Sequence, residues 1–111
     1  MKNNILTLLE NASITGSGSA LKVAGTLFTV HATAQTTSGT GSVVVVIEGS
    51  NLPSPSRDSD WNTLGTITLV PVTAGISDSF PVIVPWDKVR ARVTTLSGTG
   101  TVLSAYVCEG R

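Results

Sequence analysis

The sequence predicts an all-β protein built as an antiparallel β-sandwich. Two segments resemble each other, residues 36–49 and residues 94–110, and both carry Ser-Gly-Thr-Gly beside an apolar, β-branched run. Short strand-forming runs on either side of a glycine-containing turn are typical of a β-hairpin. The other apolar runs are also short, and several alternate with polar residues at the period of a strand. We therefore expect two similar hairpins to frame the sandwich.

The first half of the chain contains two clear strand patterns. Residues 26–35 alternate apolar and polar side chains, which predicts a half-buried strand with His31 on its threonine-bearing face. Residues 43–47 are apolar at every position, so this strand should be covered on both faces. The polar stretch 51–60 that follows contains two prolines and predicts a surface loop.

The second half adds further strands. Residues 61–70 form one, with Trp61 on the same parity as the apolar residues 67 and 69, and residues 78–84 form another, which Pro81 places at a sheet edge. In residues 88–93 one face is apolar and the other is cationic. The cationic face carries Lys88, Arg90 and Arg92. These cations either bind phosphate or acidic groups of a partner, or form a solvated face that discourages edge-to-edge pairing. The final strand continues the core with Leu103, Ala105 and Val107, and places Tyr106 and Cys108 on the opposite face.

Composition limits the possible functions. The chain has 111 residues, 13% charged residues and a formal net charge of zero. No overall field attracts nucleic acid or an anionic membrane, and low net charge favours self-association. Cys108 is the single cysteine, which excludes an internal disulfide. The apolar run near the start is about five residues, shorter than the roughly 7–15 of a signal peptide, so we expect folding in the cytoplasm.

The expected domain organisation is simple. Residues 21–111 form a single β-sandwich domain. Residues 1–20 form either an N-terminal arm that packs on a neighbouring subunit or an edge strand of the same domain. Both alternatives stay open at this point.

Catalytic and metal chemistry find little support. One histidine without nearby ligands predicts a surface residue, and Asp58 and Asp60 lack the further oxygen ligands of a calcium loop. No nucleophile elbow occurs, and the Gly-Ser-Gly and Gly-Thr-Gly pieces precede no helix that could hold phosphate. We therefore expect no enzyme activity, no cofactor and no metal.

Several pieces occur in a characteristic order. They are Thr36-Thr-Ser-Gly-Thr-Gly41, Val-Val-Val-Val-Ile-Glu-Gly-Ser50, Trp61-Asn-Thr-Leu-Gly-Thr-Ile-Thr-Leu69, Trp86-Asp-Lys-Val-Arg-Ala-Arg-Val-Thr94 and Ser97-Gly-Thr-Gly-Thr-Val102. From Thr33 through Val107 the chain thereby resembles small virion proteins of tailed bacteriophages, typified by head decoration or capsid-cementing proteins. The resemblance implies a jelly-roll-like sandwich without enzyme activity. It also implies a position on the exterior of the capsid after synthesis in the host cytoplasm.

The same resemblance suggests the partners. These are the major capsid protein lattice and further copies of the chain, as a dimer or trimer, with no nucleic acid or membrane. A small tail or neck component is an alternative location. The candidate interface residues come from the N-terminal stretch, the doubly apolar strand and the cationic face. They are Ile5, Leu6, Leu8, Leu9, Val44, Val46, Arg90 and Arg92.

A second resemblance gives a different function. The Glu48-Gly-Ser-Asn, Trp61 and Val89-Arg-Ala-Arg pieces are also similar to discoidin-type carbohydrate-binding jelly rolls. This similarity implies a glycan-binding module in which Trp61 and Trp86 stack on sugar rings. Core packing is the other use of these two tryptophans.

Overall fold

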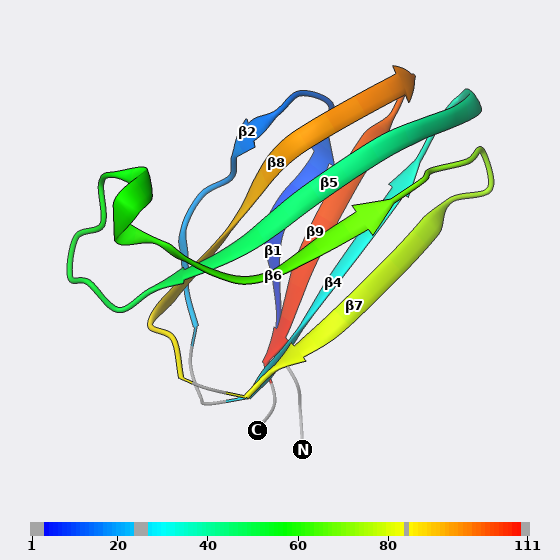
Figure 1. The fold of residues 1–111 in the computed structure, drawn as a ribbon. Helices are drawn as coiled ribbons and strands as arrows, with labels where there is room; N and C mark the ends of the chain where they lie inside the picture. The colour runs from blue at the N-terminus through cyan, green and yellow to red at the C-terminus, as the bar shows by residue number, and fades with distance from the viewer. Residues whose placement is uncertain (1–3, 24–26, 84, 110–111) are drawn as a thin grey trace.

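The computed structural model describes residues 4–23, 27–83 and 85–109, and it consists of two antiparallel sheets packed face to face (Figure 1). The strand order of the first sheet is β1-β9-β4-β7, and that of the second is β2-β8-β5-β6, with β3 also on β8. The first sheet contains β1 (Asn4–Ala12), β9 (Val102–Glu109), β4 (Phe28–Gln35) and β7 (Ile76–Val82). The second contains β2 (Gly16–Ser17), β3 (Leu21–Lys22), β8 (Lys88–Thr99), β5 (Ser38–Ser50) and β6 (Asn62–Leu69).

The strand pairs are nested along the chain. The outermost pair is β1 with β9, which encloses the pairing of β2 and β3 with β8, then β4 with β7, and innermost β5 with β6. Successive pairs fall alternately in the first and second sheets. The chain is thus one long antiparallel double strand, with the β5–β6 loop at its tip, wound into two sheets. This arrangement is a jelly roll, and the predicted all-β antiparallel sandwich is confirmed.

The core lies between the sheets and follows the predicted alternation. Along β4 the apolar positions are buried and the polar ones are mostly exposed, with His31 on the exposed face as predicted. On β8 and β9 the predicted core residues are also buried, and β5 contributes every second residue of its valine run. Fully buried residues from both sheets include Phe28, Val30, Val43, Val45, Ile47, Ile67, Val89, Leu103 and Val107.

The prediction of two hairpins is wrong. Strand β4 pairs with β7 and β9, whereas β5 pairs with β6 and β8, so the chain passes from the first sheet to the second between them. Strands β8 and β9 also lie in different sheets, so they do not pair with each other. Turn-forming residues mark a change of direction but do not determine which strands pair. The adjacent strands that do form a hairpin are β5 and β6, across the polar loop of residues 51–61.

The two Ser-Gly-Thr-Gly segments instead pack against each other. Ser38 lies opposite Thr99 and Ser42 opposite Ser97 in the β5–β8 ladder. The approach is close, because a Cβ placed on Gly98 would lie 2.7 Å from the Cα of Gly41. The look-alike segments therefore meet at one end of the sandwich, where both chain crossings occur.

The N-terminal stretch belongs to the sandwich. Strand β1 is an edge strand of the first sheet, paired antiparallel with β9, so the edge-strand alternative describes residues 4–12. The opposite edge is β7, which contains Pro81 as predicted. The expected strand limits at residues 26 and 84 lie outside the described residues. No helix among the described residues is long and apolar enough to cross a membrane.

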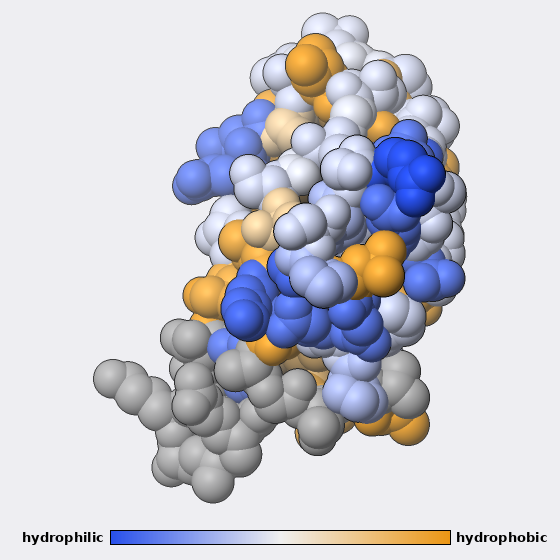
Figure 2. Space-filling model, turned by 90° about the vertical axis from the view of Figure 1, so that its left-hand side faces the viewer, coloured by the Kyte–Doolittle hydropathy of each residue, from blue (hydrophilic) through white to orange (hydrophobic). Residues whose placement is uncertain are grey.

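The β5–β6 loop extends beyond one end of the sheets and contains a short 3-10 turn, Asp58–Asp60. Figure 2 looks onto this end, where hydrophilic side chains surround separate apolar spots. A register shift between Ile47 and Glu48 occurs where β5 pairs with the start of β6. Trp61 consequently lies against Arg90 on the outer side of the sheet. The sequence pattern had grouped it with Ile67 and Leu69, which face the core.

Candidate functional site

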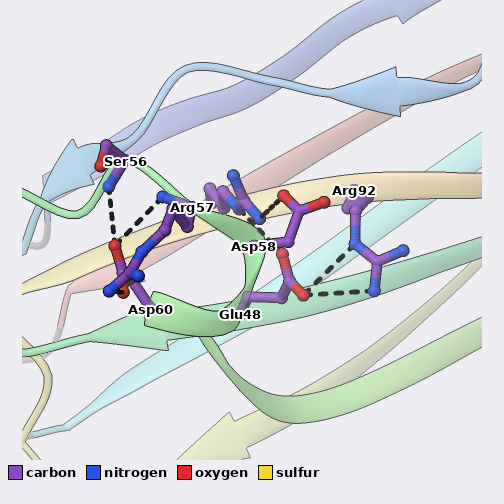
Figure 3. A network of polar contacts seen from close by, with 7 residues as sticks. Glu48, Ser56, Arg57, Asp58, Asp60 and Arg92 are labelled. Atoms are coloured by element: carbon purple, nitrogen blue, oxygen red, sulfur yellow. Dashed lines mark hydrogen bonds and ion pairs between the residues drawn. The ribbon is translucent and has the colours of Figure 1, made fainter.

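The outer face of the second sheet carries a cluster of ion pairs. Glu48 of β5 is 4% exposed, and its carboxylate accepts hydrogen bonds from Nε of Arg90 at 2.8 Å and from Nη2 of Arg92 at 3.2 Å (Figure 3). The guanidinium of Arg90 also donates to Asp58 of the loop at 3.0 Å and lies 4.6 Å from the ring centroid of Trp61. We call these five residues the ion cluster.

The loop itself is held by a second carboxylate. Oδ2 of Asp60 accepts backbone N–H groups of Ser56 and Arg57, each at 3.0 Å, and its other oxygen pairs with the Arg57 guanidinium at 3.3 Å. These backbone hydrogen bonds, with the nearby arginine charge, hold the pKa of Asp60 below its ordinary value. Asp60 therefore holds the loop through two backbone hydrogen bonds and an ion pair.

The predicted cationic face thus differs from both expected forms. Lys88 donates to Asp87 at 2.6 Å and to the Leu52 carbonyl at 3.1 Å, and its hydrogen bond lowers the pKa of Asp87. Each of the three cations has an acceptor within the same chain. Burial of Glu48 among two arginines is favourable only because both charge types are present together. The face is therefore neither a row of free cations nor a simple solvated surface.

The outer face of the first sheet has a different character. Ile5, Thr29, His31, Tyr106 and Cys108 line a shallow hollow of about 420 Å³. The strand register brings them together, because Cys108 lies opposite both Ile5 and Thr29, and Tyr106 lies opposite His31. No Lys, Arg, Asp or Glu lines this hollow. We call these five residues the uncharged face.

The predicted interface residues are spread over different environments. Leu8 is 4% exposed and belongs to the core, and Leu6 and Leu9 are half-buried against it. Ile5 is 68% exposed and lies on the uncharged face. Val44 and Val46 are half-buried in β5, whose buried positions face the core. The structure therefore brings Arg90 and Arg92 together but places Ile5 on the other sheet.

The two tryptophans also lie in different places. Trp61 is 9% exposed and covered by Arg90, so its ring is not open to a sugar. Trp86 is half-buried and lines a hollow at the β5–β6 loop. The sequence placed both beside loops but could not distinguish them, because the distinction depends on which side chains cover each ring.

Among the described residues, no group of three or more His, Cys, Asp or Glu is placed to hold a metal ion. Tyr106 and Cys108 of the uncharged face had been assigned to the non-core side of β9 but not to a site. Strand parity was the available signal for their orientation. Their proximity to Ile5 depends on the β1–β9 register, which no local pattern in the sequence indicates.

Comparisons with known proteins give one structural match and no sequence match. No protein-family model and no curated protein matches the sequence. The crystal structure of the SPBc2 prophage-derived protein YomS is similar, with a TM-score of 0.58 over 96% of this chain and 92% of the other. The two sequences are 14% identical over this match. This chain therefore shares its all-β sandwich fold with a protein of prophage origin.

Proposed function

We propose that this chain is a non-catalytic virion structural protein of a tailed phage, and that it binds a capsid lattice as a head decoration protein. Three features support the proposal. The fold is similar to that of a prophage-derived protein. The sequence resembles small virion proteins. The uncharged face offers a surface that a partner can cover at low electrostatic cost.

The uncharged face carries the proposal because of what its burial requires. Covering an unpaired charge is far more costly than covering a hydroxyl that finds a hydrogen-bond partner. Here the residues are an isoleucine, a tyrosine, a cysteine, a threonine and a histidine, with no Lys, Arg, Asp or Glu among them. Ile5 and the ring of Tyr106 supply apolar area, at roughly 25 cal/mol per Å² before association costs.

The whole outer face of the first sheet, of which the uncharged face is a part, has room for only a weak single contact. Four strands about 4.8 Å apart and about eight residues long, at 3.3 Å per residue, span roughly 500 Å². A standard interface buries about 800 Å² on each partner. A homo-oligomer, dimer or trimer, that presents several copies to a repeating lattice would gain avidity from weak contacts. On this proposal the protein lies on the capsid exterior and its partner is the major capsid protein.

The proposal is tested on phage particles. Mass spectrometry of gradient-purified particles from the phage that encodes the chain should detect the wild-type protein. A Tyr106→Arg variant should be absent from particles because it places a cation in the uncharged face. Thr66→Arg is the matched control, since Thr66 is an exposed residue of β6 on the other sheet, and it should be retained.

Two outcomes would overturn the proposal, and a third would change only the location of the protein in the particle. Absence of the wild-type protein from particles overturns the proposal, and so does retention of Tyr106→Arg at the wild-type level. Circular dichroism must show that both variants fold. Detection in isolated tails but not in heads would favour the alternative of a small tail or neck component.

A further inference from the structure

A second hollow lies at the β5–β6 loop, apart from the uncharged face. It has a volume of about 400 Å³, within the usual range for small-molecule sites. Its wall is one tryptophan ring with amide, hydroxyl and carboxylate groups around it. The residues that matter here are Trp86, Asn51, Asn62, Asp60 and Ser59. None of them lines the hollow on the first sheet.

Two of the polar groups are held in place by the backbone. Oδ1 of Asn51 accepts the backbone N–H of Asp87 at 2.7 Å, so the amide is oriented with its NH₂ group still available as a donor. The carboxylate of Asp60 is fixed by two N–H groups of the loop and by the Arg57 guanidinium, which leaves about one of its four acceptor positions free. The hollow therefore combines a fixed donor and a fixed acceptor.

The tryptophan ring is fixed as well. A Cβ on Gly49 would lie 2.7 Å from Cδ2 of Trp86, so the ring packs directly on the glycine backbone. Its Nε1 is buried and has no hydrogen-bond acceptor among the described residues. A ligand in the hollow would therefore meet the ring carbons of Trp86, because this N–H has no accessible surface.

We propose that this hollow binds a neutral saccharide unit, stacked on Trp86 and hydrogen-bonded by Asn51, Asp60 and Asn62. Sugar hydroxyls both donate and accept, which matches an amide beside a carboxylate. No Lys or Arg lines the hollow, so it offers no cation to bind a phosphate or an acidic sugar directly. Trp61 plays no part because Arg90 covers its ring.

The test is a two-dimensional ¹H–¹⁵N NMR titration of the full chain with glucose, galactose, mannose and N-acetylglucosamine at millimolar concentrations. At least one sugar should shift the Trp86 indole N–H and backbone resonances of residues 50–62 in a saturable manner. Asn62→Ala should weaken this binding about tenfold, the equivalent of 1.4 kcal/mol. Thr68→Ala is the matched control on the same strand and should bind normally, because Thr68 is exposed and does not line the hollow.

Three results overturn the proposal. The first is no saturable shift with any of the four sugars. The second is equal affinity of Asn62→Ala and wild type. The third is tighter binding of glucose 6-phosphate than of glucose, which would indicate an anion site. The proposal is independent of the virion function, since Tyr106→Arg should still bind the sugar.

Discussion

The buried carboxylate of Glu48 should be essential for stability. Replacing Glu48 with glutamine removes the charge that two guanidinium groups share, at 2.8 Å from Arg90 and 3.2 Å from Arg92. Loss of one partner of a buried ion pair costs about 3–5 kcal/mol. The Arg92 side chain is 36% exposed, so water would compensate part of this loss. We expect Glu48→Gln to lower the free energy of unfolding by about 2–4 kcal/mol.

Equilibrium urea unfolding, followed by tryptophan fluorescence, measures this loss, provided that the m-value stays constant. The matched control is Asp58→Asn, because Asp58 also pairs with Arg90 but its side chain is 88% exposed. Exposed pairs contribute about 1 kcal/mol or less. A loss below about 1 kcal/mol for Glu48→Gln, or an equal loss for both variants, would refute the role assigned to the buried carboxylate.

A combined variant separates charge from packing in the ion cluster. Glu48→Leu, Arg90→Met and Arg92→Leu together remove three charges and leave no buried charge unpaired, because the Asp58 carboxylate that loses Arg90 is 88% exposed. Replacement of a whole buried ionic group by apolar residues is often neutral or stabilising. This variant should therefore be more stable than Glu48→Gln alone. If it is less stable, the packing of the arginine side chains, and not the charge balance, dominates.

Three further predictions concern the turn glycines, the contact between β6 and β7, and the β5–β6 loop. Gly98→Ala should destabilise the protein by at least about 2 kcal/mol more than Gly39→Ala, as measured by urea unfolding. Both glycines have positive φ, but only at Gly98 would the new Cβ meet the facing segment, 2.7 Å from a backbone atom. Gly65→Ala should cost about 1–3 kcal/mol, since its Cβ would lie 2.7 Å from Cζ of Phe80, and adding Phe80→Leu should recover part of the loss. Asp60 has a lowered pKa in the folded state, so its stabilising effect is present above the ordinary value of 3.8 and is lost as pH falls through the folded pKa. Asp60→Asn should therefore make the free energy of unfolding less dependent on pH in that acid range. An unchanged pH dependence would contradict this assignment.

Local patterns in the sequence predicted the faces of individual strands well. The alternation along β4, β8 and β9 indicated which residues enter the core, and Pro81 correctly placed β7 at an edge. These features depend on a residue and its near neighbours. Burial on one face and solvent on the other is enough to produce them.

Strand pairing was not predictable in the same way. Ser38 lies opposite Thr99, and the two are far apart in the sequence. The repeated Ser-Gly-Thr-Gly segments suggested local hairpins, but each forms a crossing between sheets, and the two crossings pack together. Core burial of both sheets selects this arrangement, and that selection is a property of the whole chain.

The ion cluster was missed for a similar reason. Glu48 follows a run of apolar residues, and a charged residue at the end of such a strand usually serves to discourage aggregation. Its role as a counter-ion depends on the β5–β8 register, which places it opposite Arg90, 42 residues away. The register shift beside it also moves Trp61 out of the core pattern and against the arginine. The β5–β8 register therefore explains the pairing of Glu48, and the irregularity between β5 and β6 explains the position of Trp61.

The difference between the two outer faces favours the first sheet as the interface. On the second sheet, the cations are already paired with carboxylates of the same chain, so a partner that covered them would have to desolvate the ion cluster without supplying new counter-charges. On the first sheet, threonine and tyrosine side chains keep the surface hydrated in the free protein, and no Lys, Arg, Asp or Glu lines the hollow there. A copy of the chain related by a two-fold axis would also place no like charges opposite each other there. Of the two outer faces, that of the first sheet is therefore the one on which the proposed contacts would cost less in desolvation of charge.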